Sequence, residues 1–381
     1  METLDINVKS LIIKILWFFS PIFLIAAVLV LLGIRSGELL PIQSFINYEL
    51  SHPNTTLFLK AFLPDHYRMK YYEILRRNPE ILVVGSSRAM TFREEMFPGL
   101  DFYNGSRTVY SYEDLSDFTE LLLPKITPKI IYLELDWYWL GSHPYSHELG
   151  MVPVTKDEVY NWRVVMYFFR NSTRTLISDP ALVGRIIKRQ PEAVSNKIPI
   201  GLMAFEGDGM RYDGSFQFGT LQKRRAQSSA LVDFVQPSVL DQIRIGMGHF
   251  PFNNYLNIER LSILENFLLK AKERNIQIIG FSPPYSKEVY RELTTNPFHK
   301  DFFAESRREI SNAFRNAQFS YFDFHDLRSL GLDDGYMLDG GHMSETAAAI
   351  LLKNIISDEK LKSYLDDKIN QKSTTPLEII W

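Results

Sequence analysis

The sequence predicts a doubly wound α/β fold, in which helices cover both faces of a parallel sheet. Residues 81–84 form a continuous β-branched and apolar run, which is typical of a strand buried on both faces. Residues 129–135 and 276–281 show the same pattern, and residues 258–274 place apolar side chains along one face of a helix. Strands that alternate with helices in this way indicate a parallel sheet.

The other expected elements follow the same alternation on either side of these segments. Arg76 and Arg77 stand where the last turn of a helix would be, and Ser344 is a suitable N-cap. In chain order the remaining segments are an irregular connector at 41–64, a helix at 65–77, a strand at 101–104, a helix at 112–123, a strand at 319–324 and a helix from 344 to about 356.

The alternation is lost between residues 141 and 254. This stretch holds basic clusters at 185–189 and 223–225 and a glycine-rich run at 207–219, which has no Walker lysine. An insertion over the carboxyl ends of the strands could be a lid or docking surface, or an additional structural layer. We therefore expect a membrane anchor at 1–40 and an α/β domain at 41–381 with an insertion at 141–254.

The N-terminal region is predicted to cross a membrane. Residues 15–34 carry no charge and are long enough to span a bilayer. A cleaved signal peptide is the alternative, but the apolar run is too long and no small-x-small site precedes Arg35. Lys9 and Lys14 come before the span, which favours a cytoplasmic N-terminus and an outside C-terminal domain.

Composition excludes several classes of function. The 381 residues have a formal charge of -3, so a polyanionic nucleic-acid partner is not indicated. The absence of cysteine excludes disulfides, thiolate zinc sites and cysteine nucleophiles. His143 and His147 have the spacing of helical ligands, but Pro144 lies between them, and we predict neither a metal site nor a cofactor.

Two short motifs at opposite ends of the predicted domain supply the groups of a serine nucleophile. Gly85-Ser86-Ser87-Arg88 follows the strand at 81–84, and Asp339-Gly340-Gly341-His342 precedes the last helix. A serine hydroxyl becomes nucleophilic when an imidazole takes its proton, and a carboxylate fixes the imidazole tautomer. We therefore predict Ser87 as nucleophile, His342 as general base and Asp339 as orienter.

Simpler interpretations of both motifs remain open. Ser86 is the alternative nucleophile, and the first motif could be an ordinary turn with an N-cap serine. The second motif could be a turn with a solvated histidine. Fallback partners, which we interpret as polar residues at a strand end, are Asp323, His325 and Asp326.

The motif pair, in the order Ser, Asp, His, resembles the SGNH (GDSL-type) hydrolase superfamily. The resemblance covers residues 81–140 and 276–356 and implies a flavodoxin-like sheet. It also suggests an oxyanion or substrate-binding region around Asn104, Gly105 and Arg88, although Arg88 and Arg107 are equally suited to structural ion pairs. The family's asparagine donor is missing, since residues 134–137 read Glu-Leu-Asp-Trp.

Behind an N-terminal anchor, Gly-Ser-Ser resembles extracytoplasmic acyl-transfer proteins, such as those of teichoic-acid D-alanylation and alginate O-acetylation. The resemblance implies transfer of an acyl group, expected to be acetyl, from an acyl donor to a cell-envelope polysaccharide or polymer. It also implies a multispanning membrane acyltransferase as partner and a single-pass location in the bacterial inner membrane. A carbohydrate esterase and a non-catalytic scaffold are the alternatives.

Overall fold

The computed structural model describes residues 2–61, 66–141, 169–170, 172–173, 177, 179–189, 197–227 and 238–357. The chain divides into two compact units. Unit 1 comprises Met1–Asp65 and Val154–Gly209, and unit 2 comprises His66–Pro153 and Met210–Trp381. His143, His147 and much of the expected insertion lie outside the described residues.

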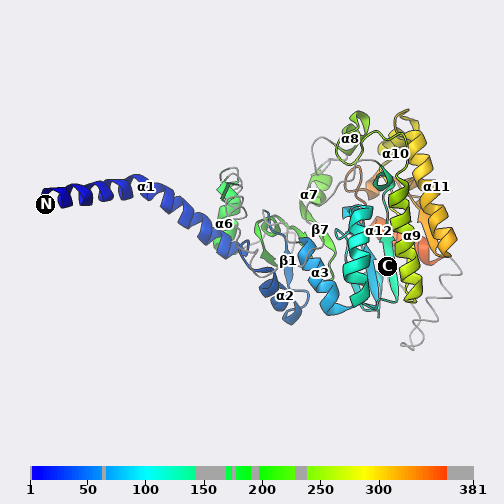
Figure 1. Cartoon of the computed structure of the whole chain (residues 1–381), viewed down its shortest axis with the longest axis horizontal. Helices are drawn as coiled ribbons and strands as arrows, with labels where there is room; N and C mark the ends of the chain where they lie inside the picture. Colours follow the sequence, from blue (N-terminus) through cyan, green and yellow to red (C-terminus); the bar gives the residue numbers. More distant parts are fainter. Residues whose placement is uncertain are drawn as a thin grey trace. The chain divides into compact units, whose positions relative to one another are not determined.

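Unit 1 contains the N-terminal helix and a small parallel strand pair (Figure 1). Leu57 of one strand is in register with Pro199 of the other. Its helices and strands are α1 (Glu2–Ser36), α2 (Ile42–Ser51), β1 (Thr56–Phe58), α6 (Pro180–Lys188), β5 (Ile198–Ile200) and β6 (Asp208–Met210), the last of which crosses into unit 2.

Helix α1 is long and apolar enough to cross a membrane. Its stretch Val8–Ser36 has a mean hydropathy of 2.8 in its most apolar window, and only 11% of that window is buried. The end of the helix differs, because Leu32 is buried in a cluster with Leu182, Ile186, Leu202 and Phe205. The last turns of the predicted span are therefore part of the core of unit 1.

The connector expected at 41–64 contains regular structure. α2 buries Phe45, Ile46 and Glu49, and the Phe45 ring stacks on Phe58 of β1 with centroids 4.0 Å apart. The prediction of an irregular segment between Pro41 and Pro64 was wrong, because tertiary packing of one apolar face stabilises a short helix there.

Unit 2 is built on a five-stranded sheet in which every pair of neighbouring strands is parallel. The order in space is β3-β2-β4-β8-β9. The strands are β2 (Ile81–Val84), β3 (Phe102–Asn104), β4 (Ile130–Glu134), β8 (Gln277–Ser282) and β9 (Ser320–Asp323). The prediction of an α/β fold on a parallel sheet is confirmed, and the expected strands lie within two residues of these bounds.

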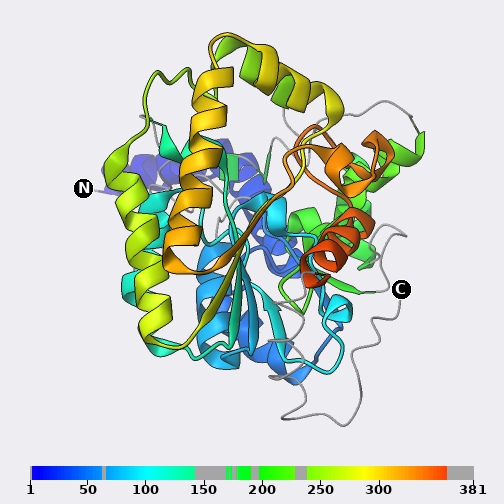
Figure 2. The same cartoon turned by 90° about the vertical axis from the view of Figure 1, so that its right-hand side faces the viewer.

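Helices cover both faces of this sheet because successive strand residues point to opposite sides. Leu82 and Leu133 join one apolar cluster, whereas Val83 and Tyr132 join the other. Figure 2 shows this layering, with yellow-green α9 and gold α11 on one side of the strands and red-orange α12 on the other. The helices of unit 2 are α3 (His66–Arg77), α4 (Tyr112–Asp117), α7 (Gly219–Gln227), α8 (Val239–Ile245), α9 (Ile258–Glu273), α10 (Lys287–Thr295), α11 (Lys300–Ala317) and α12 (Glu345–Ile356).

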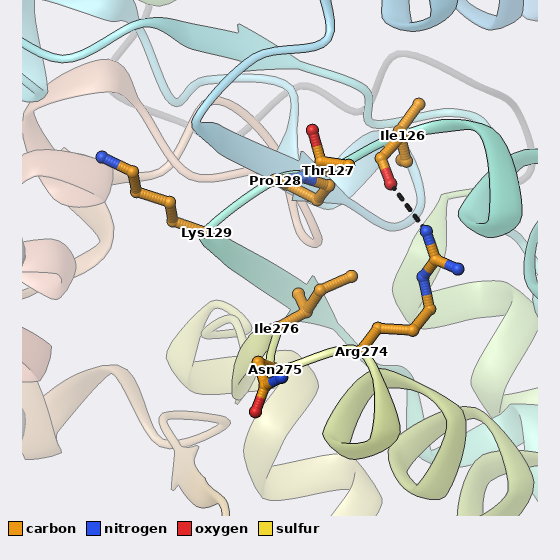
Figure 3. Close-up of a pocket in the computed structure, with 7 residues that line it drawn as sticks. All are labelled: Ile126, Thr127, Pro128, Lys129, Arg274, Asn275 and Ile276. Carbon is orange, nitrogen blue, oxygen red and sulfur yellow. Dashed lines mark hydrogen bonds between the residues drawn. The ribbon is translucent and has the colours of Figure 1, made fainter.

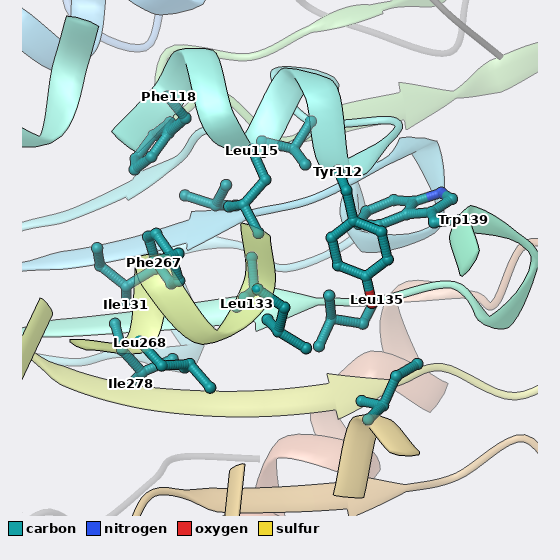
Figure 4. Close-up of a cluster of buried hydrophobic side chains, with 14 of the residues drawn as sticks. Tyr112, Leu115, Phe118, Ile131, Leu133, Leu135, Trp139, Phe267, Leu268 and Ile278 are labelled. Atoms are coloured by element: carbon teal, nitrogen blue, oxygen red, sulfur yellow. The ribbon is translucent and has the colours of Figure 1, made fainter. Parts of the chain in front are cut away.

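The first apolar cluster lies between the sheet, α4 and α9 (Figure 4). Phe118 packs edge-on against Phe267, with ring centroids 6.3 Å apart. Leu133 and Leu268 are fully buried in the same cluster. These contacts fix the sheet from which the polar strand ends project.

Two neighbouring leucines of α9 give a matched test of this packing. Leu268 is fully buried and Leu269 is 54% exposed. We expect Leu268→Ala to lower the free energy of unfolding by about 2–5 kcal/mol, because it leaves a cavity. Leu269→Ala should change it by less than about 0.5 kcal/mol. Chemical denaturation of the detergent-solubilised chain measures both, and equal losses would contradict the layering.

Candidate active site

The first motif forms a tight turn at the carboxyl end of β2. Gly85 has φ 153°, and a Cβ atom there would lie 2.5 Å from Cβ of Glu134, so only glycine fits. Ser86 follows as the N-cap of a short 3₁₀ helix, Ser87–Ala89, and its hydroxyl accepts a hydrogen bond from the N–H of Arg88. Its own N–H donates to the Glu134 carboxyl group. This turn presents Ser87 at the strand tip.

The structure brings the three predicted catalytic residues together. Oγ of Ser87 lies 2.9 Å from Nε2 of His342, and Nδ1 of His342 lies 2.8 Å from Oδ2 of Asp339. A carboxylate accepts the Nδ1 proton, so this geometry assigns Nε2 as the acceptor for the serine hydroxyl. Ser86 differs, because its hydroxyl lies 3.3 Å from Asp136.

The second motif folds around the Asp339 carboxylate. Oδ1 of Asp339 accepts hydrogen bonds from the N–H groups of Gly341 at 2.8 Å and His342 at 2.7 Å. Ser344 then caps α12 by accepting from the N–H of Ala347. The loop that carries the imidazole is thus held by its own aspartate and by the helix that follows.

Burial and charge differ between the members of this group. Burial raises the pKa of Asp339, but the His342 charge and the hydrogen bonds to this carboxylate outweigh it, so the pKa lies below its ordinary value. Asp339 therefore stays ionised at neutral pH. Its side chain is 2% exposed, whereas that of His342 is 20% exposed and Ser87 is half-buried. The serine and the imidazole are open to a substrate, and the carboxylate is not.

Arg88 connects the serine turn to three other segments. Its guanidinium forms a buried ion pair with Asp136, at the end of β4. Nε donates to the Gly341 carbonyl at 3.1 Å, and an Nη donates to the carbonyls of Pro283 at 2.6 Å and Pro284 at 3.0 Å. Arg88 was a candidate for substrate binding or for a structural ion pair. Its hydrogen bonds place it in the second role.

Asp136 and Glu134 occupy the stretch where the resembled family has its asparagine donor. Burial opposes ionisation of Asp136, but the charge of Arg88 prevails and lowers its pKa below the ordinary value. Burial and the nearby Asp136 charge raise the pKa of Glu134 well above its ordinary value. The protonated form of Glu134 is thus favoured beside Asp136, whose own charge is paired with Arg88.

Gly105 and Asn104 serve structural hydrogen bonds and not the expected oxyanion site. The N–H of Gly105 donates to the Val83 carbonyl at 2.8 Å. The Asn104 side chain donates to the carbonyls of Ala89 and Phe92 and accepts from the N–H of Ser106. Their polar groups are thus occupied by the turns after β2 and β3.

The N–H of Ser87 remains the best-placed oxyanion donor. It begins a 3₁₀ helix, where the first N–H groups have no partner within the helix. Within the described part of the chain it donates to no other group. An oxyanion on a carbonyl attacked by Ser87 would form beside this N–H.

The fallback residues form a separate pair. Nδ1 of His325 lies 2.7 Å from Asp323, which also pairs with Arg307. His325 is fully buried, and its ring stacks on Tyr285. Asp326 caps the short helix Leu327–Leu330. These are polar residues at a strand end, as expected.

Several residues near the triad carried no signal in the sequence. The Tyr138 hydroxyl donates to Asp136 at 2.6 Å, and its ring lies 5.6 Å from that of His249. Phe218 of β7 (Phe216–Phe218) lies with its ring 5.5 Å from that of His342. Neither His249 nor Phe218 stands in a recognisable motif, and only the fold brings them to this edge.

A cavity of about 200 Å³ lies at the amino ends of the strands, away from the serine turn at their carboxyl ends (Figure 3). Residues 126–129 precede β4 and residues 274–276 precede β8, so the cavity is at the amino ends of these strands. Arg274 donates across it to the Ile126 carbonyl at 3.1 Å. Ligands of parallel α/β sheets bind at the carboxyl ends, where Ser87 lies.

No protein-family model matches this chain, and no curated protein matches its sequence. The resemblance to the SGNH superfamily therefore depends on the two motifs and their surroundings.

Replacing Arg88 should destabilise the chain in a pH-dependent way. Arg88→Met leaves the buried Asp136 charge unpaired, and we expect a loss of about 3–5 kcal/mol at about pH 8. In the wild type the pKa of Asp136 is lowered, so the ionised carboxylate stabilises the fold above the ordinary pKa of aspartate. This contribution to stability is lost as the pH falls through the lowered pKa. In the variant, burial without a partner raises the pKa of Asp136, so the free energy of unfolding falls as the pH rises. The difference in stability between wild type and variant should therefore be smaller at about pH 5 than at about pH 8.

Unfolding of the detergent-solubilised chain at the two pH values measures this effect. Arg328→Met is the matched control, because Arg328 forms an exposed pair with Asp326 and should leave stability nearly unchanged. A loss for Arg88→Met that is small, or equal at both pH values, would contradict the role given to the buried pair.

Proposed function

We propose that unit 2 is a serine-dependent acyl-transfer enzyme that moves an acyl group, expected to be acetyl, from an ester donor to a hydroxyl of a polysaccharide or envelope polymer. The observation that carries this proposal is the chain of contacts from Ser87 through His342 to Asp339. A hydroxyl 2.9 Å from an imidazole that is itself oriented by a carboxylate is the arrangement of an activated serine.

The chemistry follows from the positions of these groups. Oγ of Ser87 attacks the ester carbonyl of the donor while Nε2 of His342 takes the hydroxyl proton, and the oxyanion forms beside the N–H of Ser87. The tetrahedral intermediate expels the donor alcohol, which takes the proton from His342 and leaves the acyl group on Ser87. An acceptor hydroxyl then attacks the acyl group and gives its proton to Nε2 of His342. The second tetrahedral intermediate expels Oγ of Ser87, which takes that proton back from His342 as the acylated acceptor leaves.

The arrangement of unit 2 supports an SGNH-type assignment. Numbered in chain order, its five strands have the spatial order 2-1-3-4-5, which is that of flavodoxin-like doubly wound sheets. In such sheets ligands bind where the strand order reverses, between the first and third strands. Ser87 follows β2 and Asp136 follows β4, which are those two strands.

Two features favour transfer over efficient hydrolysis. The N–H of Gly105 is occupied, and Asp136 stands in place of the asparagine donor, so the oxyanion site is weaker than that of the resembled esterases. A transferase must also exclude water from the acyl-enzyme. Phe218 of unit 2 lies beside His342, and we propose its ring as part of the cover that keeps water from the acyl group.

The proposed location is the bacterial inner membrane, with α1 as a single-pass anchor and the active site outside the cytoplasm. The length and hydropathy of α1 and the lysines before it support this orientation. An acyl donor on the outer side would have to be supplied through the membrane, so we propose a multispanning acyltransferase as partner.

Ser87 should react covalently with a serine-directed probe. We expect a fluorophosphonate to label the full-length chain in detergent, and the chain to hydrolyse 4-nitrophenyl acetate slowly. Ser87→Ala should abolish labelling and lower turnover by about a thousandfold or more, and Asp339→Asn should lower it at least about a hundredfold. Ser329→Ala, at an exposed serine, is the control.

The same assay with a polysaccharide acceptor separates the alternatives. Faster turnover together with acetylation of the acceptor supports transfer. Efficient hydrolysis that no acceptor changes would support a carbohydrate esterase. If envelope acylation is unchanged in cells that carry Ser87→Ala, the non-catalytic scaffold is the remaining alternative.

The orientation of the chain can be measured with reporter fusions after Trp381. A reporter that is active only outside the cytoplasm should be active, because the lysines before the span favour a cytoplasmic N-terminus. A cytoplasmic reporter at the same position is the matched control and should be silent. The reverse pattern would overturn the proposed orientation.

A further inference from the structure

Arg107 lies beside the serine turn and differs in its contacts from Arg88. It follows β3 by three residues, as Ser87 follows β2, and the two strands are parallel neighbours whose carboxyl ends lie at one edge. The N–H of Arg107 donates to the Gly85 carbonyl at 2.7 Å. The backbone of Arg107 is thus bound directly to the turn that presents the nucleophile.

The backbone of Arg107 is held in a conformation that side chains other than glycine rarely adopt. Its φ is 67°, in the left-handed region. Five other described non-glycine residues have positive φ. Asn54 lies in a turn three residues after α2, and four lie within two residues of a helix end, where this conformation is common: Asn78, Arg189, Asn275 and Gln318. Arg107 follows a strand. Strain of this kind is concentrated at functional sites.

The guanidinium of Arg107 is fixed at one nitrogen and open at the others. Nε donates to the Tyr110 hydroxyl at 2.7 Å. Within the described part of the chain neither terminal nitrogen has a hydrogen bond or an ion pair. The residue is half-buried, so solvent only partly hydrates this charge. The two terminal nitrogens can bind a carboxylate or a phosphate group in bidentate fashion.

We propose that Arg107 is a specificity residue that binds a carboxylate or phosphate group on the saccharide substrate of the Ser87 site. That the substrate is a saccharide rests on the proposed function. That the site binds an anion rests on the contacts of Arg107 alone. The residue does not take part in bond making. It orients an anionic sugar whose hydroxyl reaches the acyl group on Ser87.

Calorimetric titration of the full-length chain in detergent tests this binding without any turnover. The probes are α-1,4-linked trigalacturonate, its neutral galactose counterpart, and galactose 6-phosphate. We expect at least one of the two anions to bind about tenfold more tightly than the neutral sugar, and the preferred anion identifies carboxylate or phosphate. Arg107→Gln should remove the preference for the anion. Arg107→Lys should retain only part of it, because lysine keeps the positive charge but cannot bind the anion in bidentate fashion.

Arg308→Gln is the matched control, because Arg308 is an exposed arginine on α11. Equal binding of anionic and neutral sugars by the wild type, or an anion preference that survives Arg107→Gln, would overturn the proposal. In the ester assay Arg107→Gln should raise KM for the anionic acceptor about tenfold, and it should raise KM for the neutral acceptor far less. A loss of kcat on the neutral ester would instead assign Arg107 to the chemistry. If Ser87→Ala leaves turnover intact while the anion preference holds, the proposed function fails and the anion site stands.

Discussion

The buried ion pair between Arg88 and Asp136 is the interaction on which the geometry of the candidate site depends. Arg88 belongs to the serine turn, yet its guanidinium also reaches the Gly341 carbonyl in the loop before His342. Ser87 and His342 are 255 residues apart in the chain, and the Arg88 side chain, next to the nucleophile, bonds to the loop that carries the base. The Arg88 guanidinium also packs over the Tyr285 ring, with its carbon 3.8 Å from the ring centroid.

A buried pair of this kind acts through specificity more than through net stability. Desolvation of both charges offsets most of their attraction, so the pair favours one arrangement of the strand ends over others. Glu134 belongs to the same buried group: its carboxyl group accepts the N–H of Ser86, and burial together with the Asp136 charge raises its pKa. The turn is therefore oriented by groups that a substrate does not reach.

The sequence was most informative where one local pattern decides the outcome. The continuous apolar run at 81–84 predicts a strand buried on both faces, and a motif that follows such a strand is expected at the carboxyl end of the sheet. The approach of His342 to Ser87 follows from that topology. The Asp339 loop was equally predictable, because aspartate and glycine favour a turn that folds back on the carboxylate.

Other parts of the site depend on contacts between residues that are far apart in the chain, and the sequence does not show which of them meet. Whether Gly105 offers its N–H to a substrate or to Val83 depends on the register of β2 and β3, which the residues alone do not specify. The role of Arg88 required knowing that Asp136 lies within reach. Helix α2 was missed for a related reason, because the ring of Phe58 that covers Phe45 comes from the following strand.

The end of α1, the helix that is long and apolar enough to cross a membrane, packs into the core of unit 1. Leu32 is buried with Leu182 and Ile186, and Glu38, just past the helix, accepts hydrogen bonds from the N–H groups of Ala61 and Leu202. A helix fixed at one end by packing cannot rotate freely about its axis. The packing of Leu32 therefore fixes the rotation of α1 about its axis relative to unit 1. If α1 is the anchor proposed above, any partner helix in the membrane would meet the same side chains in every copy of the chain.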